Sequence, residues 1–174
     1  FTRSHGFGRG FIRFEDFFAS WADSFTRTLY GRKFVDIILP RLGYGDIVGR
    51  KSAEYVTDRT LDWIGSDSRP FFAFLNYFDA HDPYLPPQPY RSKFSRQASP
   101  GGKLNADKIR NIAQLTPYEL QGEIDAYDGA IAYVDQNIGR LLDALEEKRL
   151  AQRTVVVVVS DHGEMFGEHK LLLH

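Results

Sequence analysis

The feature that most constrains this chain is a long stretch of helical periodicity. One short apolar run comes before it and another comes after it. Thr116, Pro117 and Glu119 form a helix start, because threonine caps helices, proline suits the first helical position and glutamate completes a capping box. The apolar positions that follow alternate in steps of three and four, and they are Leu120, Ile124, Tyr127, Ile131, Val134, Ile138, Leu141 and Leu145. This spacing predicts one amphipathic helix over residues 117–149.

The two apolar runs have the composition of buried strands. Residues 71–78 follow Pro70 and are rich in phenylalanine, and residues 154–160 contain five consecutive valines. Short runs of this kind are typical of strands that are buried on both faces of a parallel sheet. A strand, a long connection with a helix and a second strand form the pattern of a parallel crossover. We therefore predict an α/β fold with a mainly parallel sheet flanked by helices.

We expect a single domain over residues 1–174, with a peripheral part and a core. Residues 1–50 are aromatic, basic and interrupted by glycines, which favours irregular surface loops. Residues 51–174 form the predicted core, which opens with a helical pattern over residues 51–64. Residues 85–115 contain several prolines and little regular pattern, and long loops of this kind often carry function.

The composition argues against several classes of function. A formal net charge of −1 gives no electrostatic basis for binding nucleic acid. No apolar run approaches the roughly 20 residues needed to cross a bilayer. The chain has no cysteine, which excludes disulfides and thiolate metal sites within these residues. A cysteine-free chain fits the cytoplasm and the periplasm equally.

Residues suited to chemistry follow each predicted strand. His81 comes soon after the first strand, and Asp161 and His162 come directly after the second. Parallel strands end at the same edge of a sheet, where ligands bind in open α/β folds. A carboxylate followed by an imidazole offers an oxygen and a nitrogen ligand to one divalent cation. On these residues alone, a purely structural explanation, in which Asp161 caps a turn and His162 is a surface residue, accounts for the pair as well as a metal site does.

Four further residues are not expected to take part in chemistry. Asp79 and Asp82 flank His81 and could orient it, although we expect solvated loop carboxylates. Tyr127 and Tyr133 lie within the helical pattern and are expected to pack the helix rather than take part in chemistry.

Three motifs follow one another in the core. They are the apolar run with His81-Asp82-Pro83-Tyr84 after it, the helical pattern over residues 127–142, and Asp161-His162-Gly163-Glu164 after the valine run. In this order they resemble the sulfatase family of the alkaline phosphatase superfamily, over about residues 6–174. The resemblance implies an alkaline-phosphatase-like α/β fold and a metal-dependent hydrolase of sulfate esters. Similarity to secreted and periplasmic sulfatases points to a location outside the cytoplasm.

The resemblance also implies roles for individual residues. Asp161 and His162 match the pair that ligates the catalytic cation, usually Ca²⁺, with Mg²⁺ or Mn²⁺ as alternatives. His81 matches a catalytic histidine that contacts the sulfate near the leaving group. His174 matches a substrate-binding position where many members have lysine, so the choice between sulfate and phosphate esters stays open. The implied substrate is an anionic ester, either a sulfated or phosphorylated small molecule or a glycan.

One family motif does not occur in these residues. The nucleophile of the family lies in a Cys/Ser-x-Pro-x-Arg segment, and the 174 residues contain none. We therefore expect an internal fragment that is inactive and poorly soluble alone, because its sheet would keep an unpaired edge. Two alternatives stay open. The first is a phosphonate or phosphodiester hydrolase, or a phospho-group transferase, of the same superfamily; the second is an inactive homologue that binds an anion or a partner.

Overall fold

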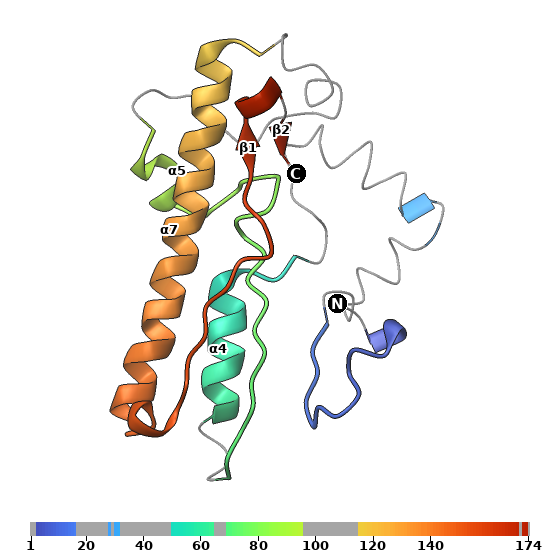
Figure 1. Cartoon of the computed structure of the whole chain (residues 1–174), viewed down its shortest axis with the longest axis vertical. Helices are drawn as coiled ribbons and strands as arrows, with labels where there is room; N and C mark the ends of the chain where they lie inside the picture. The colour runs from blue at the N-terminus through green and yellow to red at the C-terminus, as the bar shows by residue number, and fades with distance from the viewer. Residues whose placement is uncertain are drawn as a thin grey trace. The chain divides into compact units, whose positions relative to one another are not determined.

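The computed structural model describes residues 3–16, 28, 30–31, 50–64, 69–95, 115–170 and 172–173. The chain divides into two compact units, residues 1–51 and residues 52–174. In chain order, the elements are η1 (Arg3–His5), α4 (Ala53–Ile64), α5 (Tyr90–Lys93), α7 (Pro117–Glu147), η4 (Ala151–Arg153), β1 (Met165–Phe166), η5 (Glu168–Lys170) and β2 (Leu172–Leu173) (Figure 1). Within these ranges, no helix combines the length and the apolarity needed to span a membrane.

The first unit is described mainly by residues 3–16, which form a short 3-10 helix followed by turns. Arg3 closes this loop, because its backbone N–H donates to the Asp16 carboxylate at 2.9 Å. Its guanidinium also donates to the carbonyl oxygen of Phe14 at 2.9 Å. Most of residues 17–49, which we expected to be irregular, lies outside the described part of the chain.

The long helix α7 begins at the predicted residue and ends two residues earlier than predicted. The Thr116 hydroxyl accepts the N–H of Glu119 at 3.2 Å, and the Glu119 carboxylate accepts the N–H of Thr116 at 3.0 Å. This reciprocal capping box satisfies two N–H groups that have no partner within the helix. At the other end, Arg149 adopts a left-handed φ of 56°, so the helix stops at Glu147.

The buried face of α7 differs from the predicted apolar stripe. Leu141 and Leu145 are buried as expected, but Ile131 is 42% exposed. The buried positions are mostly small or polar, and they are Gly122, Glu123, Ala126, Gly129, Ala130, Tyr133, Asn137, Leu141 and Leu145. Close approach explains this choice, because a Cβ on Gly129 would lie 2.5 Å from the carbonyl oxygen of Tyr90 in α5. Small residues therefore let the neighbouring backbone approach this face of α7 closely.

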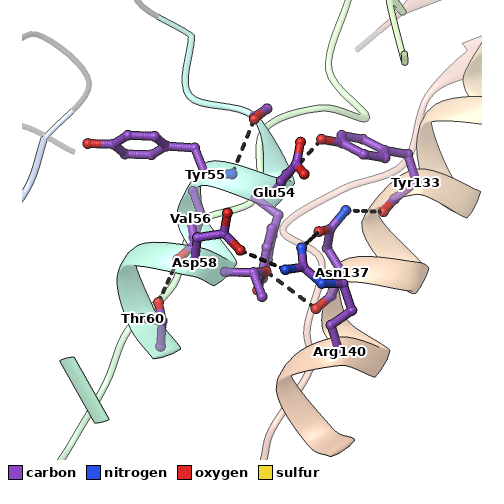
Figure 2. A network of polar contacts seen from close by, with 11 residues as sticks. Glu54, Tyr55, Val56, Asp58, Thr60, Tyr133, Asn137 and Arg140 are labelled. Atoms are coloured by element: carbon purple, nitrogen blue, oxygen red, sulfur yellow. Dashed lines mark hydrogen bonds and ion pairs between the residues drawn. The ribbon is translucent and has the colours of Figure 1, made fainter. Parts of the chain in front are cut away.

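Hydrogen bonds donated by side chains join α4 to α7, one to a main-chain carbonyl oxygen and one to a carboxylate (Figure 2). The Thr57 hydroxyl donates to the carbonyl oxygen of Asn137 at 3.3 Å and lies 2.9 Å from the Tyr77 hydroxyl. The Arg140 guanidinium donates to Asp58 at 2.7 Å and to the Asn137 side chain at 2.9 Å. Thr57 and Asn137 are fully or almost fully buried, so these bonds offset the cost of removing their polar groups from water.

A small apolar core lies between α4 and α7. Ile64, Leu141 and Leu145 are its buried members. The partly buried residues that pack against it are Leu61, Trp63, Phe71, Leu75, Leu150 and Ala151. The predicted helix at residues 51–64 is thus present as α4, and its apolar end contributes to this core.

The first predicted strand, residues 71–78, is an extended segment that packs on one side. Phe71 meets the ring of Trp63 edge-on at 5.6 Å, and Leu75 also contacts the apolar core. Phe72 and Phe74 are 73% and 57% exposed. The segment is therefore covered on its helix side, whereas a strand in the interior of a parallel sheet is covered on both faces.

The second predicted strand, residues 154–160, is more exposed. Each of the five valines exposes 47% or more of its surface. Within the described residues, strand pairing joins only β1 to β2, in an antiparallel pair in which Met165 faces Leu173. The predicted parallel sheet is therefore not confirmed. The physical reason is that each apolar run lacks the neighbouring strand, among the described residues, that would pair with its backbone.

Candidate active site

The first loop of the candidate site, residues 79–84, carries His81. The imidazole ring of His81 stacks on the Phe78 ring, with centroids 4.4 Å apart and planes 18° apart. The Nδ1 atom of His81 lies 2.6 Å from the carbonyl oxygen of Asp82. A carbonyl oxygen can only accept, so Nδ1 carries the proton, and Nε2 is the acceptor atom of the neutral ring. Stacking and this bond together set the orientation of the imidazole.

Asp79 departs from its predicted role as a solvated carboxylate. Asp79 is 7% exposed, so it is a buried residue at the start of the first loop. Burial raises the pKa of Tyr77 and of Tyr133, and the negative charge of Asp79 contributes to both shifts. Asp79 therefore acts electrostatically on two tyrosines of the α4–α7 region. Tyr133 is buried against Tyr90, as its predicted packing role requires.

The second loop, residues 160–164, carries Asp161 and His162 at the surface. The side chain of Asp161 is 91% exposed and that of His162 is 42% exposed. The Nε2 atom of His162 lies 3.7 Å from Oδ2 of Asp161, and its Nδ1 atom lies 2.9 Å from the carbonyl oxygen of Gly163. Because Nδ1 must donate to that carbonyl, Nε2 of the neutral ring is an acceptor that faces a carboxylate. Two such atoms side by side suit a shared cation.

Local hydrogen bonds shape the turn that contains this pair. The N–H of His162 donates to Oδ1 of Asp161 at 3.1 Å, and the Ser160 hydroxyl donates to the carbonyl oxygen of His162. Asp161 therefore does cap its own turn, as one interpretation of the sequence required. That bond uses Oδ1, while Oδ2 faces the imidazole. This structural contact is compatible with the predicted metal-ligating role of Asp161.

Three aromatic rings join the two loops to α7. The Tyr84 ring lies 5.2 Å from that of Tyr127 in α7 and 5.9 Å from that of Phe166 in β1. The rings of Tyr127 and Phe166 are 5.3 Å apart. Tyr127 thus packs the helix as predicted. Tyr84 and Phe166 were not predicted as site residues, although Tyr84 ends the motif that begins at His81.

The surroundings of the Tyr84 hydroxyl are buried and negative. Tyr84 is 0% exposed, and one carboxylate oxygen each of Asp82 and Glu164 is also shielded from solvent. Burial is the largest cause of the strongly raised pKa of Tyr84, followed by the charges of Glu164 and Asp82. The hydroxyl therefore stays protonated near neutral pH and can act as a hydrogen-bond donor.

The described residues do not by themselves show a metal site. No group of three histidine, cysteine or acidic side chains in this part of the chain is placed to hold a metal ion. Asp161 and His162 fit a divalent cation as two donors, since a carboxylate oxygen and an imidazole nitrogen are among its usual ligands. The predicted substrate-binding residue His174 lies outside the described residues.

Comparison with known proteins identifies the family. The model of the sulfatase family matches residues 1–174, so the chain belongs to the sulfatase family. This membership implies an alkaline-phosphatase-like α/β fold for the protein. No solved structure matches the chain significantly.

Three relatives illustrate the range of the family. The chain is 28% identical over 145 residues to the multifunctional alkaline phosphatase superfamily protein PehA of Trinickia caryophylli, which covers 68% of the chain. It is 29% identical over 129 residues to an arylsulfatase of Clostridium perfringens, covering 66% of the chain. It is 23% identical over 150 residues to iduronate 2-sulfatase of Homo sapiens, covering 72% of the chain. The matched segments span 27–28% of the length of these relatives.

Proposed function

We propose that the protein containing these residues hydrolyses sulfate esters with a divalent cation held by Asp161 and His162. The observation that carries this proposal is the 3.7 Å approach of the two donor atoms in a chain of the sulfatase family. At the level of the family, relatives named arylsulfatase and iduronate 2-sulfatase support a sulfate ester hydrolase. Ca²⁺ is the first choice of cation, and Mg²⁺ or Mn²⁺ are the alternatives.

Each member of the donor pair has its own part in this mechanism. When bound, the cation would polarise the ester oxygens and so stabilise charge in the transition state. Asp161 would provide a charged oxygen ligand, and its 91% exposed side chain can approach a cation without leaving a buried position. His162 would provide Nε2, and its Nδ1 contact with the carbonyl of Gly163 holds the required tautomer.

His81 is proposed as the catalytic residue near the leaving group. Its Nε2 atom would contact the sulfate. In the imidazolium form both ring nitrogens carry a proton, so the Nε2 proton could pass to the departing ester oxygen and leave the neutral ring protonated on Nδ1. Stacking on Phe78 and the Nδ1 contact with Asp82 limit rotation of the ring, so the imidazole keeps one orientation. His174 is proposed to bind the substrate anion, and the nucleophile is expected from residues beyond this chain.

A second candidate function is the hydrolysis of phosphate diesters or phosphonates at the same site. It is favoured by the 28% identical PehA, whose name describes a multifunctional protein of the alkaline phosphatase superfamily. A histidine at position 174, where many sulfatases have lysine, also leaves the preference between the two anions open.

The test is an assay of the full-length protein with 4-nitrophenyl sulfate, bis(4-nitrophenyl) phosphate and a phenyl phosphonate ester. The protein is stripped with EDTA and reloaded with Ca²⁺, Mg²⁺ or Mn²⁺. We expect sulfate ester hydrolysis that needs the cation, together with a cation-dependent rise in the unfolding midpoint. Faster turnover of the phosphorus esters would favour the second candidate. Absence of all three activities and of the midpoint shift would leave the inactive homologue.

A further inference from the structure

The hydroxyl group of Thr57 in α4 is buried between two other segments of the chain. Thr57 is 0% exposed, and its Oγ1 atom lies 3.3 Å from the carbonyl oxygen of Asn137 in α7 and 2.9 Å from the hydroxyl oxygen of Tyr77. The first bond fixes the direction of the second. Because a carbonyl oxygen can only accept, the single hydroxyl proton of Thr57 goes to Asn137, and Tyr77 donates its own proton to Thr57.

The α7 side of this contact is held by further hydrogen bonds. Asn137 is 1% exposed, and its side-chain amide donates to the carbonyl oxygen of Tyr133 at 2.8 Å. The Arg140 guanidinium donates to the Asn137 side chain and to Asp58, the residue after Thr57 (Figure 2). The Tyr133 hydroxyl accepts a main-chain N–H from the first turn of α4 at 3.3 Å. These bonds hold α4 against α7, so Thr57 offers Tyr77 an acceptor at a fixed place.

Tyr77 lies near the end of the extended segment that leads to His81. Apolar contacts hold the first part of this segment to the core, and the Tyr77 hydroxyl adds a polar contact closer to the loop. The next residue, Phe78, stacks on the His81 ring with centroids 4.4 Å apart, and its carbonyl oxygen accepts the N–H of His81 at 3.3 Å. A shift of Tyr77 would therefore move the residue that orients the imidazole.

Packing alone requires neither hydroxyl. Valine has the branching of threonine and phenylalanine keeps the ring of tyrosine, whereas a buried hydroxyl costs free energy unless it is hydrogen-bonded. We propose that Thr57 is a positioning residue, whose hydroxyl sets the orientation of His81 through Tyr77 and Phe78. This inference rests on the proposed function and deepens it, because neither the family resemblance nor the comparisons give Thr57 or Tyr77 a role.

The first experiment compares Thr57→Val, which removes the hydroxyl, with Thr57→Ser, which keeps it, in the full-length protein. Thr57→Val is expected to lower kcat for 4-nitrophenyl sulfate about tenfold with KM little changed, because a misplaced imidazole weakens binding of the transition state more than binding of the substrate. Thr57→Ser should stay within about twofold of the wild type. A merely structural role of Thr57 would not produce this difference between valine and serine.

Thr60→Val is the matched control for the loss of a buried threonine hydroxyl. Thr60 lies in the same helix and is 7% exposed, and its hydroxyl donates to the carbonyl oxygen of Val56 within α4 at 2.7 Å. This variant should leave kcat unchanged, because its bond does not reach the segment before His81. A loss of kcat as large as that of Thr57→Val would mean that any change in α4 lowers activity, and it would overturn the inference.

Tyr77→Phe removes the other end of the bond and keeps the contact between Thr57 and Asn137, so it tests the inference without disturbing the two helices. It should lower kcat by about the same factor as Thr57→Val, and the double variant by no more than either, because both changes remove one interaction. Tyr118→Phe is its control, since Tyr118 lies in the first turn of α7 and is 49% exposed. If the two losses multiply in the double variant, the hydroxyls act separately and the inference is wrong.

Hydrogen–deuterium exchange follows the loop without relying on activity. Peptides covering residues 78–84 should exchange several-fold faster in Thr57→Val and Tyr77→Phe, and peptides covering residues 160–166 should not change. Thr57→Ser and the two control variants should match the wild type over both ranges.

The outcomes separate this inference from the proposed function. Normal kcat and normal exchange in Tyr77→Phe would overturn the inference while leaving the hydrolase intact. A loss of kcat in Thr57→Ser equal to that in Thr57→Val would also overturn it, since the effect would not follow the hydroxyl. If the wild-type protein hydrolyses none of the esters, the proposed function fails. The exchange of residues 78–84 in Tyr77→Phe then decides the inference alone.

Discussion

The two loops of the candidate site differ in what holds them. In the first loop, Asp79 and Tyr84 are 7% and 0% exposed, and His81 stacks on a neighbouring ring. In the second loop, Asp161 and His162 have exposed side chains, and the hydrogen bonds described for them reach one or two residues along the chain. The first loop is preorganised by packing, whereas the ring contacts described near the second loop are those of Phe166, which lies just after it. We infer that cation binding orders the second loop more than the first.

The segments that lead into these loops show the same difference. Residues 71–78 place Phe71 and Leu75 against the apolar core, while residues 155–159 leave all five valines exposed. Within the described residues, two segments of similar apolar composition therefore differ in burial: one packs against the core and the other is exposed. Composition measures the tendency to be buried, but a partner surface must be present before that tendency stabilises anything.

The largest effect is expected at the exposed loop. Asp161→Ala in the full-length protein should lower sulfate ester hydrolysis by about 10³-fold, because it removes a charged ligand of the proposed cation. It should also abolish the cation-dependent rise in the unfolding midpoint, which differential scanning fluorimetry measures. Asp62→Ala, on the exposed side of α4, is the matched control and should change neither. A variant that keeps both properties would remove Asp161 from the metal site.

A smaller effect is expected at the packed loop. His81→Ala should lower kcat by about 10²-fold, the size of a lost proton-transfer group, while the Ca²⁺ concentration for half-maximal activity stays the same. Steady-state kinetics over a range of Ca²⁺ concentrations checks both values. His5→Ala, which alters an exposed histidine of the first unit, should have no effect. A changed Ca²⁺ requirement in His81→Ala would mean that the two loops are not functionally separable.

The segments before the loops can be compared by truncating one side chain in each. Leu75→Ala should lower the free energy of unfolding by about 1 to 2 kcal/mol, since Leu75 is partly buried against the core. Val157→Ala should lower it by less than about 0.5 kcal/mol, since Val157 is 74% exposed. Urea denaturation measures both. An equal loss in the two variants would show that the valine segment is packed in a sheet.

The smallest effect concerns pH. Burial raises the pKa of Tyr84, so the folded protein keeps a phenolic proton that the unfolded chain releases above about pH 10. The free energy of unfolding should therefore be unaffected by this group below about pH 10. Above that pH it should fall, by up to about 1.4 kcal/mol per pH unit. Urea denaturation at pH 9, 10 and 11 measures the slope, which should be shallower in Tyr84→Phe and unchanged in Tyr118→Phe.

The helices were the most predictable part of the fold. The capping box at Thr116 and Glu119 is local chemistry, and it placed the start of α7 correctly. The apolar stripe was a poorer guide, because the helix buries Gly129 and Asn137 while exposing Ile131. Periodicity counts apolar residues, but it cannot register a backbone that approaches Gly129 or hydrogen bonds that satisfy Asn137.

The sequence suggested candidate residues for the site but not how they are arranged. His81, Asp161 and His162 could be named from motifs, because a resemblance attaches roles to positions. The buried state of Asp79 and the ring contacts of Tyr84 could not be named, since they depend on α7 and β1 packing against the loops.

By itself, the sequence determined the family and the helix start, because these depend on side-chain type and local spacing. It also suggested two candidate cation ligands, Asp161 and His162. The tertiary structure decided which face of α7 is buried, how Tyr84 joins the two loops, and which apolar run finds a surface to cover it. These outcomes depend on contacts between residues that are far apart in the chain. No local pattern specifies such contacts, because the free energy of burial belongs to both surfaces that meet.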